Sequence, residues 1–126
     1  MKGVVFTDSE TMCVKDFAEP LYRTAGEVVG GPIEVVRPRG LKRPLCFLCN
    51  EEGLLQRLPM NILGSVWYGT GEHGHPIVGT IVVMKEGMTE EGPDIIGLSD
   101  GEIRKVREMA LDLSCGMIQD LDAGEE

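Results

Sequence analysis

The sequence lacks the features that mark a membrane or secreted protein. No apolar run among its 126 residues approaches the roughly 20 residues that a helix needs to cross a bilayer. The N-terminal stretch MKGVVFTD breaks off too soon for a signal peptide. We therefore expect a cytoplasmic protein that has no membrane partner.

Basic residues are also scarce. The 12 Lys and Arg residues stand against 21 Asp and Glu residues, which leaves a formal net charge of -9. Phosphate contacts need basic side chains, so this balance argues against a partner that is duplex nucleic acid. The excess of acidic residues is confined to residues 86–126, because the acidic and basic residues of 1–85 are equal in number and give no net charge. We expect one domain, with a neutral, sheet-rich body at 1–85 and an acidic C-terminal helix and tail at 86–126.

The motifs of several common enzyme classes are missing. No G-x-S-x-G sequence, Walker loop or dinucleotide-binding glycine fingerprint follows a predicted strand. The sequence therefore gives no support for a hydrolase or a phosphotransferase of these classes.

Cysteine and histidine are too few and too awkwardly spaced for a convincing zinc site. The C-x-x-C pair Cys46 and Cys49 could be combined with His73 and His75. Side chains three apart on a strand point to opposite faces, however, and the two histidines are separated by only one residue. We expect buried structural cysteines, no disulfide, no metal and no cofactor.

Short β-branched runs predict that the body is a sheet. Strands are expected at residues 2–7 and 12–17, and again at 33–36 and 45–49 on either side of a basic tip. The run IVGTIVVMK at 77–85 predicts a central strand, while residues 68–76 and 86–97 have the composition of loops. The fold class is therefore α+β, with a mostly antiparallel sheet of about five strands.

Two helices are predicted to pack on one face of this sheet. A short helix follows Pro20 and covers residues 21–29, where a glycine pair ends it. A longer helix begins at the S-x-x-E capping box of Ser99 and Glu102. It carries apolar residues at helical spacing, namely Ile103, Val106, Ala110, Leu113 and Met117.

A basic loop is the first candidate site. Arg37, Arg39, Lys42 and Arg43 lie within seven residues, and the fork of a guanidinium suits a phosphate or a carboxylate. This loop could bind an anion. It could equally be a solvated hairpin tip, or pair with the acidic C-terminal segment of the same chain or of a neighbouring subunit in a homo-oligomer.

The second candidate site lies around the glycine-rich stretch 68–76. If Trp67 and Tyr68 fold near the basic loop, aromatic faces and guanidinium groups would form a nucleotide-sized site. Glu72, His73 and His75 could supply a general base or an anion contact at neutral pH, or could simply be solvated.

Four elements occur in an order that resembles a small domain family of unknown function carried by phages and mobile elements. They are VGGPIEVV at 29–36, NEEG at 50–53, LPMN at 58–61 and IVGTIVV at 77–83. The resemblance covers roughly residues 20–85 and implies a setting beside antirestriction and other counter-defence genes, with no catalytic residue to carry over. Asn50 and Asn61 belong to the recurring elements. We expect Asn50 to stabilise a turn and Asn61 to cap the segment that follows it, with ligand binding as the alternative for both.

The leading hypothesis is a phage or mobile-element accessory protein of the host cytoplasm that sequesters a small anionic, nucleotide-like ligand of host defence without catalysis. A second hypothesis is an acidic inhibitor of a host defence or nucleic-acid-handling protein, acting through residues 120–126 and the exposed helix face. A third is a small hydrolytic enzyme that uses Glu72, His73 and His75.

Overall fold

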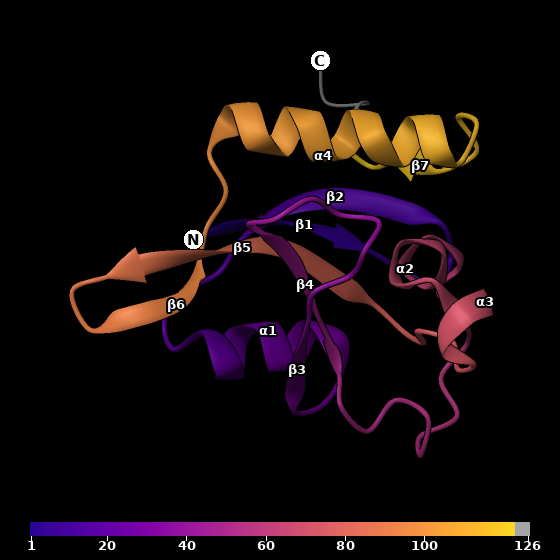
Figure 1. Cartoon of the computed structure of the whole chain (residues 1–126), viewed down its shortest axis with the longest axis horizontal. Helices are drawn as coiled ribbons and strands as arrows, with labels where there is room; N and C mark the ends of the chain where they lie inside the picture. Colours follow the sequence, from indigo (N-terminus) through magenta and orange to yellow (C-terminus); the bar gives the residue numbers. More distant parts are fainter. Residues whose placement is uncertain (123–126) are drawn as a thin grey trace.

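The computed structural model describes residues 1–122, which form seven strands and four helices (Figure 1). The strands are β1 (Lys2–Phe6), β2 (Thr11–Asp16), β3 (Ile33–Val36), β4 (Leu45–Asn50), β5 (Ile81–Thr89), β6 (Gly92–Ile96) and β7 (Gln119–Asp120). The helices are α1 (Leu21–Val29), α2 (Ile62–Tyr68), α3 (Thr70–His73) and α4 (Asp100–Leu113). Within residues 1–122, no helix is long and apolar enough to cross a membrane.

The strands form one sheet in the order β3-β4-β5-β1-β2-β7, and β6 pairs with β5 off this path. The short β7 lies parallel to β2, and all other pairings are antiparallel. The predicted α+β class and mostly antiparallel sheet are confirmed. The strand count exceeds the expected five because β6 and β7 had no clear signal in the sequence.

The sheet is covered on both faces, so α1 and α4 lie on opposite sides of it and not on the one face that was expected (Figure 1). Ile81, Val82, Val83 and Met84 of β5 are all fully buried. Because successive strand residues point to opposite faces, such a run needs cover on both sides. Alternate residues of β5 accordingly pack into two separate cores, one beneath α4 and one against α1.

The apolar stripe of α4 is buried only in part. Ile103, Val106 and Ala110 are buried, but Leu113 is 43% exposed and Met117 is 76% exposed. The helix ends at Leu113, and Cys115 and Gly116 then adopt positive φ angles of 54° and 75°. This turn directs the chain toward β7, so the helical spacing no longer applies to Met117.

Residues 86–96 form a hairpin and not the expected loop. Strand β5 continues through residue 85 to Thr89, turns at Glu90 and Glu91, and returns as β6. A Cβ atom on Gly87 would lie 2.3 Å from Cδ1 of Ile96, so glycine allows the isoleucine side chain to cross this strand. The hairpin projects from the body of the molecule, at the left of Figure 1.

Candidate functional site

Two segments that are distant in the sequence meet at one cavity beside the edge strand β3. The cavity has a volume of about 390 Å³, which is within the range of small-ligand sites. The basic loop contributes two of its arginines and the segment 68–77 contributes three ring-bearing side chains; the five are Arg37, Arg39, Tyr68, His73 and His75. Val36, Cys49 and Ile77 add apolar lining, and Glu34 adds one carboxylate.

A close backbone contact holds the basic loop against α2. The N–H of Gly40 donates to the carbonyl oxygen of Trp67 over 2.9 Å. A Cβ atom on Gly40 would lie 2.8 Å from both Cα and the carbonyl oxygen of Trp67, closer than such atoms can approach. Only glycine fits here, and its absence of a side chain brings Arg39 within reach of the segment that follows α2.

The segment after α2 folds its rings into a cluster. Gly69 and Gly74 adopt φ angles of 84° and 85° at the two ends of α3 and reverse the chain on each side of it. The ring of Tyr68 lies 4.6 Å from that of His73 and 5.0 Å from that of His75, measured between centroids. Its hydroxyl also lies 2.9 Å from Nε2 of His75. The cluster gives the cavity an aromatic wall.

The two arginines of the cavity are already paired with carboxylates. Nε and Nη2 of Arg37 donate to the two carboxylate oxygens of Glu86 over 2.5 and 2.9 Å, and this contact lowers the pKa of Glu86 and raises that of Arg37. Arg39 donates from Nη1 to Glu72 over 2.6 Å, and both of these side chains are largely exposed. Since exposed ion pairs are weak, the pair of Arg39 is the one that an incoming anion can replace.

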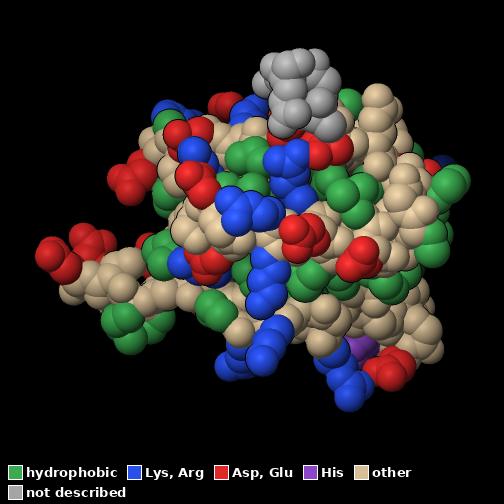
Figure 2. All heavy atoms as spheres, turned by 90° about the horizontal axis from the view of Figure 1, so that it is seen from above, with side chains coloured by type: hydrophobic (Ala, Val, Ile, Leu, Met, Phe, Trp, Pro, Cys, Tyr) green, Lys and Arg blue, Asp and Glu red, His purple; other side chains and the backbone are tan. Residues whose placement is uncertain are grey.

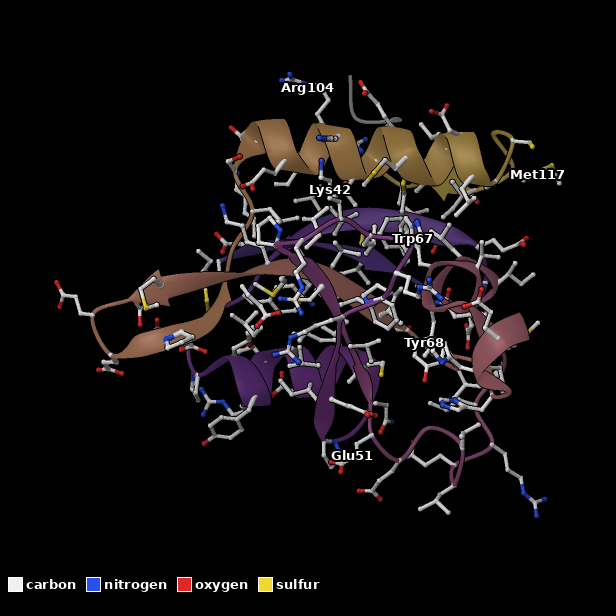
Figure 3. All side chains as sticks on the ribbon, viewed as in Figure 1. Lys42, Glu51, Trp67, Tyr68, Arg104 and Met117 are labelled. Atoms are coloured by element: carbon white, nitrogen blue, oxygen red, sulfur yellow. The ribbon has the colours of Figure 1, made fainter. Side chains whose placement is uncertain are left out.

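The remaining residues of the basic loop lie outside the cavity. Lys42 and Arg43 are exposed and are absent from its lining. Figure 3 places Lys42 near α4, well apart from Tyr68.

Trp67 lies in the core and not in the cavity. Its side chain is 4% exposed, and its ring meets that of Phe6 edge to face, with centroids 5.3 Å apart and planes at 82°. It packs in the cluster beneath α4 together with Leu41, the apolar anchor of the basic loop. Its role is therefore to hold the loop in place, while the neighbouring Tyr68 reaches the cavity.

The two asparagines also have structural roles. Asn61 caps α2 by accepting from the N–H of Gly64 over 2.9 Å, and its amide donates to the carbonyl oxygens of Phe6 and Gly79 over 3.0 and 2.8 Å. Asn50 accepts from the N–H of Glu52 over 2.8 Å, as expected for a turn. Asn50 also donates to the carbonyl oxygen of Val29 and to Gln56. These bonds occupy both side chains inside the protein.

The comparisons with known proteins identify the family but not its activity. A family model described as a domain of unknown function, DUF3846, matches residues 1–111. The chain belongs to this family. The match agrees with the small family of unknown function that the sequence resembles, and its phage setting stays a prediction. No curated protein and no solved structure matches the chain. The matched region contains every residue that lines the cavity.

Of the four cysteines of this DUF3846 protein, Cys46 and Cys49 are buried as expected, whereas Cys13 is half-buried and Cys115 is exposed. Cys46 and Cys49 both lie on β4, where Cys46 pairs with Met84 of one core and Cys49 packs in the other core. Burial raises the pKa of Cys46 to about 11 and that of Cys49 to about 12. Within residues 1–122, no three His, Cys, Asp or Glu side chains are grouped so that they could hold a metal ion.

Part of the acidic segment that follows the DUF3846 match packs against the rest of the fold, where its carboxylates bind α4 and β2. Asp120 forms an ion pair with Arg107 of α4, and Asp122 accepts from the N–H of Val14 over 2.7 Å. Glu125 and Glu126, the other acids of the predicted inhibitory tail, lie outside the described residues. Arg37 pairs with Glu86, the first residue of the acidic segment 86–126, so the alternative in which the basic loop pairs with that segment holds for this one arginine; the sequence did not single out Glu86, which lies 49 positions away.

Proposed function

We propose that this DUF3846 protein binds a small anionic, nucleotide-like ligand in the cavity beside β3 and sequesters it, as an accessory protein of a phage or mobile element. The observation that carries the proposal is the convergence of Arg37 and Arg39 with the rings of Tyr68, His73 and His75 around one cavity. A nucleotide needs a cationic group for its phosphate and a flat surface for its base, and these are the two kinds of side chain that meet here.

The geometry assigns different roles to the two arginines. Arg37 is held on both carboxylate oxygens of Glu86, so it is a fixed cation at the cavity wall. Arg39 is 77% exposed at its side chain, and within residues 1–122 it is paired only with the exposed Glu72. A ligand phosphate would displace Glu72 and take a guanidinium that is already positioned, which lowers the ordering cost of binding.

The ring cluster supports binding more directly than hydrolysis. Glu72, the carboxylate that a hydrolytic site would use as a base, accepts a hydrogen bond from Arg39 in the free protein, and the hydroxyl of Tyr68 lies 2.9 Å from Nε2 of His75. These contacts keep the rings together as a surface for stacking. Val36 and Ile77 extend that surface with apolar groups.

Thermal melts with ATP, cyclic nucleotides and ADP-ribose test the proposal. A ligand that binds only the folded protein raises the melting midpoint, and the stabilisation grows with the logarithm of the ligand concentration relative to Kd. Arg39→Gln and Tyr68→Ala should each remove the shift. Arg23→Gln and Tyr22→Ala are matched controls, because both residues are exposed on α1, away from the cavity lining.

The outcomes separate the three hypotheses. The proposal is supported if a ligand raises the melting midpoint, the two cavity variants abolish this shift and the two controls retain it. It is contradicted if none of the ligands raises the midpoint. Ligand recovered unchanged after heat release supports sequestration, whereas a cleaved product points to the hydrolytic alternative. If activity in a phage-protection assay depends on residues 118–126 but not on Arg39, the inhibitor hypothesis is correct instead.

A further inference from the structure

A second groove lies at the other end of β3, between the N-terminal end of α1 and the β5–β6 hairpin, and shares Val35 with the lining of the first cavity. It has a volume of about 670 Å³, enough for several side chains. Apolar side chains of α1, β3 and β6 line it, namely Leu21, Ile33, Val35 and Ile95. We call it the hairpin groove. These four residues are only partly buried, so they leave apolar surface open to solvent.

The charged side chains in the lining of the hairpin groove are all acidic. Glu19 lies beside α1, and Glu91 and Asp94 belong to the hairpin. None of the three forms an ion pair with any residue in the described range 1–122. Lys and Arg are absent from the lining, and the N-terminal ammonium of Met1, which lies nearby, is paired with Asp16 over 2.7 Å. The groove therefore presents unbalanced negative charge around an apolar surface.

Two exposed apolar side chains extend this surface. Tyr22 lines the groove and is 71% exposed, and Met88 stands on the same hairpin with 77% of its surface exposed. The hairpin that carries Met88 reaches out from the body with acidic side chains at its end, at the left of Figure 2. Contiguous apolar surface that is rimmed by polar groups marks an interaction site on a protein.

We propose that the hairpin groove docks a segment of a partner protein in which Lys or Arg residues alternate with large apolar residues. The apolar side chains of that segment would cover Leu21, Val35 and Ile95, and its cations would meet Glu19, Glu91 and Asp94. A cation placed over the face of Tyr22 gains a further attraction. Charge complementarity selects this occupant, because an acidic segment would be repelled by three unpaired carboxylates.

The segment docks through its side chains and not by adding a strand to β6. Pro93 has no N–H to donate, and the N–H of Ile95 is taken by the side chain of Asp94 over 2.8 Å. These two positions leave the edge of the hairpin poor in free donors, which is how edge strands avoid pairing. Recognition therefore rests on the groove lining, and single substitutions there should be decisive.

Fluorescence anisotropy with three synthetic peptides tests the docking site on the intact chain. One peptide alternates lysine with leucine, one alternates glutamate with leucine, and one alternates lysine with serine. We expect only the first to bind. Tyr22→Ala and Asp94→Lys should each weaken it by about tenfold, the loss expected when one central contact is removed. Glu108→Lys, an equal charge reversal on the exposed side of α4, should leave the Kd unchanged.

Each other result overturns the proposal. Equal binding of the lysine–serine peptide, or an equal loss in Glu108→Lys, would mean attraction to the net charge of the protein alone. Failure of the lysine–leucine peptide to bind refutes the site, provided that circular dichroism shows a folded chain. If the apparent mass of the protein rises with its concentration, and Tyr22→Ala and Asp94→Lys abolish this rise, the groove binds a second copy of this chain instead. The cavity beside β3 shares none of the substituted residues, so its ligand shift should survive in all three variants.

Discussion

The carboxylate of Glu72 lies 2.6 Å from Nη1 of Arg39, so the anion on this guanidinium in the free protein comes from the chain itself. Both partners are exposed, and α3, which carries Glu72, is a single short helix between two glycines of positive φ. An exposed pair of this kind contributes only about 0–1 kcal/mol. It keeps Arg39 positioned at the cavity without blocking a stronger anion.

Glu72→Gln should therefore tighten ligand binding. Removing the competing carboxylate leaves Arg39 free for a phosphate, and we expect the Kd of the nucleotide that gives the largest thermal shift to fall by about two- to fivefold. Isothermal titration calorimetry measures this change. The same substitution at Glu108, which is exposed on α4 and absent from the cavity lining, is the control. Weaker binding in Glu72→Gln would show that this carboxylate contacts the ligand itself.

Glu102 makes the stability of the protein sensitive to acid. Hydrogen bonds from Lys85 and from the N–H of Ser99 lower its pKa from 4.5 to about 2. Because the folded pKa lies below the unfolded one, the stabilisation is complete above pH 4.5 and is lost as the pH falls toward 2. In Glu102→Gln, the free energy of unfolding should be lower than in the unchanged protein near neutral pH, and the difference should shrink below pH 4.5.

Urea denaturation at a series of pH values measures this difference. Glutamine can still close the capping box, so the comparison isolates the charge of Glu102. Glu108→Gln is the control, because it removes a charge from the same helix at a residue that makes no ion pair within residues 1–122. The difference in the free energy of unfolding between this variant and the unchanged protein should not vary with pH. A difference that grows on acidification would contradict the assignment.

Asn61 holds together three parts of the fold that are remote in sequence. Its side chain caps α2 and bonds to the carbonyl oxygens of Phe6 and Gly79, and it is 1% exposed. Asn61→Ala should lower the free energy of unfolding by about 2–4 kcal/mol, because it removes a cap and leaves two buried carbonyl oxygens without a donor. Asn61→Asp keeps the cap acceptor but buries a carboxylate against the same two carbonyl oxygens, so its loss should be at least as large as that of alanine. A loss under about 0.5 kcal/mol in Asn61→Ala would refute the structural role.

The sequence predicts best those elements whose determinants are local. Pro20 and Gly30 lie at the two ends of α1, whose observed bounds are the predicted ones, and the capping box of Ser99 and Glu102 starts α4 where expected. The cap expected at Asn61 is the N-cap of α2, but the helix itself was not predicted, and the bonds of Asn61 to the carbonyl oxygens of Phe6 and Gly79 depend on segments remote in sequence. The same reason explains the hairpin: the pairing of β6 is visible only once β5 is in place.

The candidate site shows the same division between residue type and placement. Arg37, Arg39, Tyr68, His73 and His75 were selected by their chemistry, and the cavity brings them together. Residue type alone could not separate Trp67 from Tyr68, because adjacent residues of a helix point in directions about 100° apart and only the packing shows which one faces the core. Glu72 was selected as a candidate, but its pairing with Arg39, like that of Glu86 with Arg37, joins segments that are distant in the sequence.

Gly40→Ala should separate the assembly of the cavity from the chemistry of its residues. The added methyl group would overlap backbone atoms of Trp67, which cannot yield as a flexible side chain does, so the basic loop must move away from α2. Arg39 moves with the loop, and we expect the ligand-induced thermal shift to be lost while every cavity side chain remains. Gly71→Ala is the matched control, since a Cβ atom there meets nothing within 4 Å. Differential scanning fluorimetry with and without the nucleotide compares the two variants. A full shift in a folded Gly40→Ala protein would mean that the position of the basic loop does not matter to the ligand, and would contradict the role given to Arg39.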